Sequence, residues 1–414
     1  MKIVITNGYT WNNSGDAGII IGTIELMRQT FGEETEITVF TATPELDQTM
    51  YSRSGVRARF MHHMLVMPQN YFGVIPYNSY FLIPQTLFGS IKFALGKWYL
   101  DRHKENYKAL KAADLIVVCG GGFLGGNNFF GNMSQLYQVK INLKYKKKVI
   151  VLGDSVEPAD KWYACRMLKH TLGRVSRFYS REYITTDFLR EKLKLQNVTE
   201  IPDMAFFFDK GTSPINIREY YGLEQGQLII GITLRDCFKK KEYVKYREPY
   251  IEAVVRFISE TIDKYQCFLC CVPFCRNDGD DDRIISEEVI GYLDDKYKDF
   301  VRILDCEMSP PQLKGLMQQM DYFVGTRMHS NIFAMSVGVP VIAMKYEEKT
   351  QGIMAMMGME DYVFNAYHPD VDGMLQSLEK QMKDREVIVN GLLQKVERFR
   401  GRIAEELRSC LCVE

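Results

Sequence analysis

Short runs of apolar, β-branched residues alternate with segments of helical periodicity along most of the chain, and this alternation constrains the fold more than any other feature. It is typical of parallel sheets covered by helices, so we expect an α/β protein. The predicted strands are Lys2–Thr6, Glu36–Phe40, Asp114–Cys119, Lys148–Leu152 and Phe178–Ser180 in the first half, and Leu228–Leu234, Gln266–Val272, Phe300–Leu304, Asp321–Val324 and Pro340–Met344 in the second.

The alternation lapses between residues 208 and 227, where glycines and a proline interrupt any period, and then starts again. A chain of 414 residues is long enough for two domains. We therefore place an N-terminal α/β domain at 1–208 and a C-terminal α/β domain at 209–375, followed by a helical segment at 376–414. Two such domains facing across a cleft would bind ligands at the carboxyl ends of their strands.

Charge and hydropathy limit the kinds of molecule that the protein is expected to bind. The 52 basic side chains balance 52 acidic ones, so no overall field attracts nucleic acid. The sequence shows neither a secretory signal pattern nor an apolar run of the roughly 20 residues that span a bilayer, and we expect a cytoplasmic protein. Residues 70–100 are aromatic-rich and low in acid. They could pack on the first domain as a loop or contact the inner face of the membrane.

Four of the ten cysteines, Cys267, Cys270, Cys271 and Cys275, lie in or beside a predicted strand. No second ligand pair follows at zinc-finger spacing, and small apolar thiols suit a strand interior. We predict that these cysteines pack in the core and bind no metal.

A glycine-rich segment, Gly120–Gly126, follows a predicted strand and has the form G-x-G-x-x-G. Dinucleotide binding would also need an acidic residue about 20 positions further on. That position falls in the basic stretch KYKKKVIV, so we exclude NAD binding. The remaining interpretation is a bend at which the backbone of Gly121 and Gly122 closely approaches a substrate.

The loop after the first strand reads NGYTWNNSGDAG, and Asp16 is expected to cap the helix that follows. Backbone amides at such a helix N-terminus can hold a hydroxyl or phosphate group. We therefore expect Asn12 and Gly15 to bind such a group, with Asp16 as a base or an anchor for the hydroxyl. Taken alone, the loop is more typical of an ordinary helix cap.

One segment of the second half is the most informative. Arg327 and His329 follow a strand and precede a helix predicted at Asn331–Val337, and Lys345 and Lys349 follow the next strand. Parallel sheets bind ligands at this position. Arginine matches carboxylate or phosphate with two donors, lysine supplies a point charge, and histidine exchanges a proton near neutral pH. The segment therefore predicts an anion site with a proton donor.

Six short motifs occur in a fixed order along the chain. They are Asn12 with Gly15 and Asp16, the glycines 120–122, VLGDSVEP at 151–158, Ser180-Arg181-Glu182, Pro202-Asp203-Met204-Ala205-Phe206, and Arg327-x-His329 followed by Tyr346-x-x-Lys349. The ordered set resembles the polysaccharide pyruvyl transferase family over about residues 12–350. That resemblance implies two Rossmann-like domains arranged as in GT-B glycosyltransferases. It also implies phosphoenolpyruvate as donor and a sugar of a surface polysaccharide as acceptor.

The resemblance also implies roles for single residues. By motif match, Arg181, Arg327, His329 and Lys349 would bind the donor or act in catalysis. One position departs from the family pattern, because Glu157 stands where a glycine is usual. This residue could alter the choice of acceptor or the shape of its loop, and no role is carried over to it.

A reaction can be built from these charges. Phosphoenolpyruvate brings about three negative charges, which two arginines with Lys345 and Lys349 can offset. His329 is expected to protonate the methylene carbon, so that a sugar hydroxyl attacks C2, phosphate leaves and a second hydroxyl closes a cyclic ketal. We expect a galactose-type acceptor, carried on a lipid such as undecaprenyl diphosphate, and no metal or separate cofactor.

Two other interpretations remain open. A GT-B glycosyltransferase with a nucleotide-sugar donor would share the fold and a basic donor pocket, and it would release a nucleoside diphosphate instead of phosphate. A non-catalytic scaffold of polysaccharide assembly would keep the fold with a degenerate cleft. The scaffold would show no thermal stabilisation by phosphoenolpyruvate.

Overall fold

The computed structural model describes residues 1–63, 104–277 and 279–412. The segment 70–100, for which the sequence predicts either a packed loop or a membrane contact, lies outside the described residues. Contacts divide the chain into two compact units, the N-terminal unit and the C-terminal unit. The first comprises Met1–Trp11, Ile19–Met204 and Gly401–Glu414, and the second comprises Asn12–Gly18 and Ala205–Arg400.

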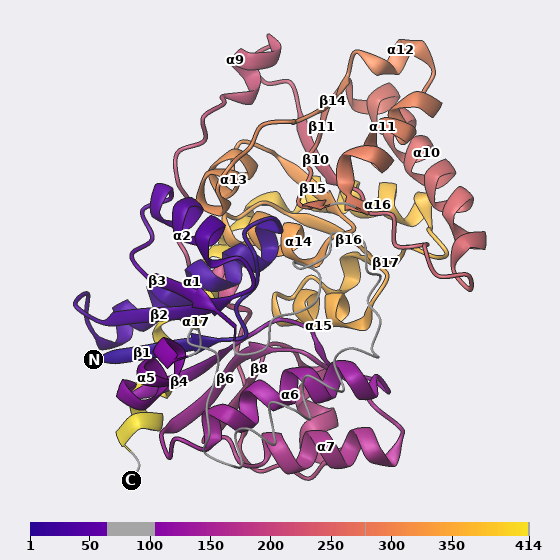
Figure 1. Cartoon of the computed structure of the whole chain (residues 1–414). Coiled ribbons are helices and arrows are strands. Elements are labelled where there is room, and N and C mark those ends of the chain that lie inside the picture. The colour runs from indigo at the N-terminus through magenta and orange to yellow at the C-terminus, as the bar shows by residue number, and fades with distance from the viewer. Residues whose placement is uncertain (64–103, 278, 413–414) are drawn as a thin grey trace. The chain divides into compact units, whose positions relative to one another are not determined.

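The N-terminal unit is built on a seven-stranded sheet with the order β3-β2-β1-β4-β6-β8-β9 (Figure 1), and each neighbouring pair is parallel. Its strands are β1 (Lys2–Thr6), β2 (Glu36–Thr41), β3 (Arg59–His62), β4 (Leu115–Cys119), β6 (Lys148–Asp154), β8 (Arg177–Ser180) and β9 (Val198–Glu200). The helices are α1 (Ser14–Phe31), α2 (Pro44–Arg53), α5 (Lys104–Ala112), α6 (Phe129–Leu143), α7 (Trp162–Leu172) and α8 (Tyr183–Asp187).

The C-terminal unit has a six-stranded parallel sheet with the order β14-β11-β10-β15-β16-β17. Its strands are β10 (Ile229–Thr233), β11 (Phe268–Cys271), β14 (Val301–Ile303), β15 (Tyr322–Gly325), β16 (Val341–Lys345) and β17 (Val363–Asn365). The helices are α9 (Ile217–Tyr221), α10 (Arg247–Tyr265), α11 (Asp282–Tyr292), α12 (Asp295–Lys298), α13 (Pro310–Met317), α14 (Met328–Ser336), α15 (Glu348–Met356) and α16 (Val371–Lys383). Helix α17 (Arg385–Cys412) begins in this unit, and its residues from 401 onward belong to the N-terminal unit.

The ten predicted strands are all present, and each observed end lies within two residues of its prediction. The sequence did not reveal the edge strands β3, β9 and β17. These strands have four residues or fewer and mix polar with apolar side chains, because an edge strand is paired on one side only. Buried central strands, in contrast, need continuous apolar runs and are therefore easy to recognise.

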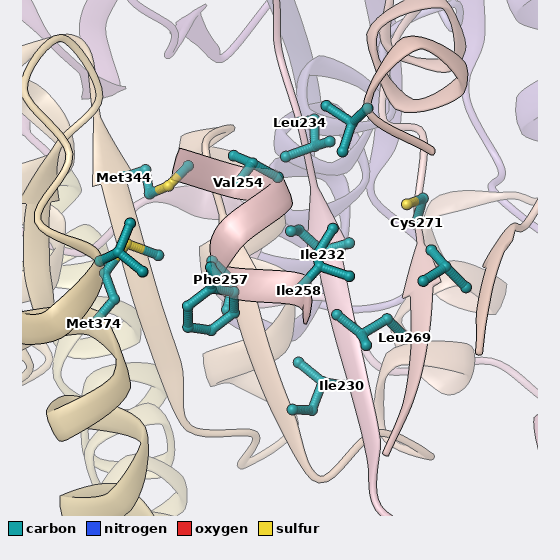
Figure 2. Packing of buried hydrophobic residues seen from close by; sticks show 14 of the residues in the cluster. Ile230, Ile232, Leu234, Val254, Phe257, Ile258, Leu269, Cys271, Met344 and Met374 are labelled. Atoms are coloured by element: carbon teal, nitrogen blue, oxygen red, sulfur yellow. The ribbon is translucent and has the colours of Figure 1, made fainter. Parts of the chain in front are cut away.

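The core of the C-terminal unit explains why the sequences of its strands are continuously apolar. Figure 2 shows helix α10 lying over strand β10, with Val254, Phe257 and Ile258 directed at Ile230 and Ile232. All five side chains are buried, as are the neighbouring Leu269 of β11 and Met344 of β16. Because these side chains are closely packed, the apolar face of α10 is held against the sheet.

Two cysteines in or beside β11 belong to the same core. Cys267 and Cys271 are buried members of the cluster around α10, which confirms their predicted packing. Burial raises the pKa of both thiols to about 12, so they stay protonated at neutral pH. In the part of the chain that the structure describes, no helix is both long and apolar enough to cross a bilayer.

The two units exchange short segments, and in this they differ from the domains placed at 1–208, 209–375 and 376–414. Residues 12–18 join the C-terminal unit, where the Ser14 amide donates to the Phe274 carbonyl at 3.1 Å and Asn13 forms a β-bridge with Cys275. Residues 401–414 join the N-terminal unit, where the Arg408 guanidinium donates to the Thr30 carbonyl at 3.3 Å.

We predict that Phe257→Ala destabilises the protein by about 3–5 kcal/mol, because removal of a buried ring loses transfer free energy and leaves a cavity. Phe257 is 1% exposed between α10 and the sheet. The exposed Glu252 of the same helix provides the control, since Glu252→Ala removes no buried contact. The free energy of unfolding in urea measures both effects, and equal values for the two variants would contradict the packing described.

Candidate active site

Charged side chains collect at one edge of the C-terminal sheet. Because β10, β11, β15 and β16 are parallel, their carboxyl ends meet at this edge. We use the name charge cluster for five residues found just beyond these strands: Arg235 after β10, Asp280 and Asp282 in the connection after β11, Arg327 after β15 and Tyr346 after β16.

Arg327 is the buried centre of the charge cluster. It is the residue before α14, and its side chain is 9% exposed. Its Nε lies 2.9 Å from both carboxylate oxygens of Asp282, and its Nη2 donates to Asp282 Oδ1 at 2.6 Å. Asp280 Oδ1 lies 2.9 Å from the same Nη2. The guanidinium predicted to bind an anion is therefore already held by two carboxylates of the protein.

Burial, opposite charges and backbone amides together set the ionisation of this network, and burial leaves the pKa of Asp282 above its usual value. Asp282 Oδ2 also accepts from the amides of Phe274 and Cys275, at 3.0 and 3.1 Å. Burial by itself would lower the pKa of Arg327, but the carboxylates outweigh burial and raise it, so Arg327 stays charged. Burial acts to raise the pKa of Asp280, yet Arg327 and Arg235 bring it below its usual value.

Arg235 and Tyr346 extend the charge cluster toward solvent, and neither was assigned to a site from the sequence. Arg235 Nη2 donates to Asp280 Oδ2 at 3.2 Å, Nη1 donates to the Tyr346 hydroxyl, and the guanidinium lies 4.9 Å from the centre of the Tyr346 ring. Its Nε is buried with no hydrogen-bond partner among the described residues. Arg235 directly follows the strand predicted at 228–234, so its position after a strand was the available signal.

His329 lies in the first turn of α14, not in a loop before the helix as predicted. The helix begins at Met328 because the extended residue Arg327 already supplies the N-cap, and Ser330 Oγ donates back to the Arg327 carbonyl at 2.7 Å. His329 packs against the first turn of α1. A Cβ atom on Gly15 would lie only 2.4 Å from His329 Nδ1. The structure therefore brings two predicted site residues, Gly15 and His329, together within the C-terminal unit.

The cap of α1 also differs from the prediction. Asn13, not Asp16, caps the helix, since Asn13 Oδ1 accepts from the amides of Gly15 and Asp16 at 3.0 and 3.3 Å. Asp16 lies in the first turn of α1 and is half-buried. Its negative charge there interacts favourably with the partial positive charge of the helix N-terminus. Asn12 is exposed. Asp16 thus belongs with His329 in the C-terminal unit and not with the first domain.

The two lysines of the predicted anion site lie at the end of β16 and the start of α15. Lys345 Nζ is 2.9 Å from a carboxylate oxygen of Glu348, and Lys349 Nζ is 2.5 Å from one of Glu347. Both glutamates are exposed, with side chains 70% and 45% accessible. Exposed ion pairs of this kind contribute only about 0–1 kcal/mol. An anionic ligand can therefore displace them far more easily than the buried pair of Arg327.

Arg181 belongs to the N-terminal unit. It follows β8 and is 1% exposed. Its Nη1 donates to Asp203 Oδ2 at 2.5 Å and its Nε donates to Ser155 Oγ at 2.8 Å. Burial alone would lower the pKa of Arg181, but Asp203 raises it. Three motifs that are separate in the sequence thus meet in one buried polar cluster.

The glycine-rich segment adjoins the same motifs. A Cβ on Gly120 would lie 2.1 Å from the Gly153 carbonyl oxygen, so only glycine permits this approach of two strand ends. The Gly121 carbonyl accepts from the Ser155 amide at 3.0 Å, whereas Gly122 is exposed. Glu157 continues this contact, because its carbonyl accepts from the amide of Gly126 at 2.7 Å. Its departure from the family pattern is therefore accommodated in a short strand pair.

Comparison with known proteins decides the family. A family model described as polysaccharide pyruvyl transferase matches residues 13–348, which is most of the chain. The chain belongs to the polysaccharide pyruvyl transferase family. It is therefore a transferase of polysaccharide biosynthesis. A relative, the amylovoran biosynthesis protein AmsJ of Erwinia amylovora, is 24% identical over 429 residues that cover 98% of this chain and 95% of that protein.

Solved structures confirm the fold class of this pyruvyl transferase family member. The Anabaena protein Alr3699/HepE in complex with UDP and glucose has a TM-score of 0.61 at 14% identity and covers 99% of this chain and 100% of its own. The UDP complex of MnaA from S. aureus has a TM-score of 0.57 at 12% identity, with 100% and 98% covered. The glycosyltransferase SnogD from Streptomyces nogalater has a TM-score of 0.53 at 10% identity, with 99% of both chains covered. The α/β, GT-B-like class with two Rossmann-like domains is thus confirmed, and the cleft between them stays a prediction.

We predict that Gly15→Ala displaces the His329 ring, because the added methyl would overlap it. The NMR signal of His329 should shift, and if His329 is the predicted proton donor, turnover should fall about 100-fold, as expected when a catalytic group is misplaced by about 1 Å. Gly391→Ala in α17 is the matched control, since a Cβ there has nothing within 4 Å. An unshifted histidine signal with full turnover in Gly15→Ala would refute the contact.

We also predict that Asp282→Asn destabilises the protein by about 3–5 kcal/mol, because it leaves the buried Arg327 without its main counter-charge. Asp299→Asn is the control, as Asp299 is 94% exposed and pairs with Arg302 at 3.4 Å, so its loss should cost about 0–1 kcal/mol. Urea unfolding at pH 7 compares the two. Similar losses in the free energy of unfolding of both variants would show that the pair of Arg327 and Asp282 contributes no more to stability than an exposed ion pair.

Proposed function

We propose that this protein transfers the enolpyruvyl unit of phosphoenolpyruvate to a sugar and closes a cyclic pyruvate ketal during synthesis of a surface polysaccharide. The observation that carries the proposal is the family match from residue 13 to 348, which spans both Asp16 and His329. The relative AmsJ, whose name assigns it to amylovoran biosynthesis, supports a polysaccharide as product. We propose a galactose-type acceptor carried on undecaprenyl diphosphate at the cytoplasmic face of the membrane.

The arginines and lysines have different roles in donor binding. Arg327 is fixed by two carboxylates, so we assign it to positioning the first turn of α14 and thereby His329. Lys345 and Lys349 pair only with exposed glutamates and are free to exchange them for the donor's phosphate and carboxylate. Arg235 joins them as a donor ligand, because its buried Nε still lacks a hydrogen-bond partner among the described residues.

Arg181 is proposed to act in the same way as Arg327. Its guanidinium is held by Asp203 and Ser155, so it fixes the strand ends that carry the glycines of the N-terminal unit. We keep Gly121 and Gly122 of the N-terminal unit, and Asn12 and Gly15 of the C-terminal unit, as proposed acceptor-binding residues. Phosphoenolpyruvate is a substrate in this scheme, which assigns no further cofactor or metal.

His329 and Asp16 carry the proton transfers of the proposed reaction. The imidazolium of His329 gives a proton to the C3 methylene carbon, which becomes a methyl group, and the electron deficiency moves to C2. A sugar hydroxyl forms a C–O bond to C2 as Asp16 accepts its proton. The bond from C2 to the phosphate oxygen then breaks, inorganic phosphate leaves, and a second hydroxyl of the sugar closes the ketal. The proton of that hydroxyl goes to the phosphate, and the proton held by Asp16 returns to His329.

We predict that His329→Ala lowers phosphate release from phosphoenolpyruvate by about 10²–10⁴-fold, the usual contribution of a general acid. Asp16→Asn should lower it as well, since amide nitrogen and oxygen accept no proton at neutral pH. The exposed His368 supplies the control variant His368→Ala. The assay uses phosphoenolpyruvate with lipid-linked sugars and follows free phosphate, and mass spectrometry detects the added ketal. Wild-type rates in His329→Ala would refute its role, and nucleoside diphosphate release from a nucleotide sugar would refute the reaction.

A further inference from the structure

Positive charge is concentrated on helix α7, in a part of the N-terminal unit that the proposed reaction does not use. Residues 161–177 contain no aspartate or glutamate, although the whole chain balances 52 basic side chains with 52 acidic ones. The basic residues of this stretch are Lys161, Arg166, Lys169, Arg174 and Arg177. A local excess of this size in a neutral chain gives one surface a strong positive potential.

The carboxyl end of α7 borders a hollow of about 610 Å³ whose charged lining is entirely basic. The side chains concerned are exposed, and none forms an ion pair with a carboxylate among the described residues. Part of the repulsion between them is offset by the helix, whose C-terminus carries partial negative charge. The basic and imidazole residues of the lining are Arg166, Lys169, His170, Arg174 and Lys194.

An aromatic edge lies at the other end of the same helix. Trp162, the first residue of α7, is 75% exposed, and its ring lies edge-on 6.2 Å from Tyr163, which in turn contacts Phe129 of α6 at 5.8 Å. Helices α6 and α7 pack side by side (Figure 1). Spacing of four and three residues places Trp162, Arg166 and Lys169 on one face of α7. A large indole exposed beside basic side chains is typical of a membrane interface.

We propose that this surface, the α7 face (Trp162, Arg166, Lys169, Arg174 and Lys194), docks the protein on an anionic lipid bilayer. Arg166 and Lys169 lie on the helix that begins at the exposed indole, and Arg174 and Lys194 lie beyond its carboxyl end, so the charges are spread out and suit a planar surface better than one small anion. Each basic residue near an anionic leaflet strengthens binding about fivefold, so four of them give a few hundredfold and a reversible attachment. The inference goes beyond the proposed function and does not depend on it, but it would bring the enzyme to a lipid-linked acceptor.

Sedimentation with vesicles tests the proposal on the full-length protein. Wild type should bind vesicles of phosphatidylcholine with phosphatidylglycerol, bind pure phosphatidylcholine far less, and lose binding in 0.5 M salt. The triple variant Arg166→Gln/Lys169→Gln/Arg174→Gln should bind about 100-fold more weakly. Its matched control, Lys240→Gln/Lys241→Gln/Lys383→Gln, removes three exposed charges from the C-terminal unit and should bind like wild type. Equal binding of both triple variants would overturn the proposal.

Fluorescence and competition identify the face and the ligand. Anionic vesicles should shift the tryptophan emission of wild type to the blue, and Trp162→Phe should abolish that shift. Binding without any shift would place another surface on the membrane and overturn the assignment. Inorganic phosphate at a few millimolar should not release the protein, since release would indicate a small-anion site. The triple variant should keep full turnover with a water-soluble acceptor, which separates this test from that of the proposed reaction.

Discussion

The ion pair between Arg327 and Asp282 is the interaction on which the candidate active site depends. Asp282 receives hydrogen bonds from Arg327 and from the amides of Phe274 and Cys275, so one carboxylate joins the end of β15, the connection after β11 and the start of α11. Both charged groups are buried. A buried pair of this kind cannot lose one partner without leaving an uncompensated charge, and the start of α14 is fixed as a result.

The N-terminal unit contains a similar buried arginine–aspartate pair formed by other residues. Arg181 follows β8 as Arg327 follows β15, and each guanidinium is held by a buried aspartate. An arginine beyond a strand end therefore serves first to fix the loops that a ligand would meet. The charges that exchange most easily are those of Lys345 and Lys349, whose partners are exposed. Rigid arginines and loosely paired lysines together suit a site that keeps its shape while it takes up an anion.

The fold by itself does not select this chemistry. Proteins solved with UDP share the fold at 12% and 14% identity. It is the family match, and not the fold, that identifies this chain as a member of the polysaccharide pyruvyl transferase family. Function in such folds resides in the side chains at the strand ends. Here they include a histidine in the first turn of α14 and a charge cluster that contains as many aspartates as arginines.

The sequence by itself determined the strands and the residues that follow them. Central strands such as β4 (Leu115–Cys119) must be apolar on both faces, and this requirement is visible in the residue pattern. Arg327 and His329 were found because they follow such a strand. Arg235 could have been found in the same way. Three of the four edge strands of the two main sheets, β3, β9 and β17, escaped, because an edge strand needs no continuous apolar run.

Only the tertiary structure decided what these residues touch. Asp282 is 45 residues from Arg327 and Asp203 is 22 residues from Arg181, so no local pattern marks either pair. The same holds for residues 12–18, which include the start of α1 and belong to the C-terminal unit through contacts with Phe274, Cys275 and His329. Periodicity records which side chains are buried, whereas the choice of buried partner depends on how distant segments pack.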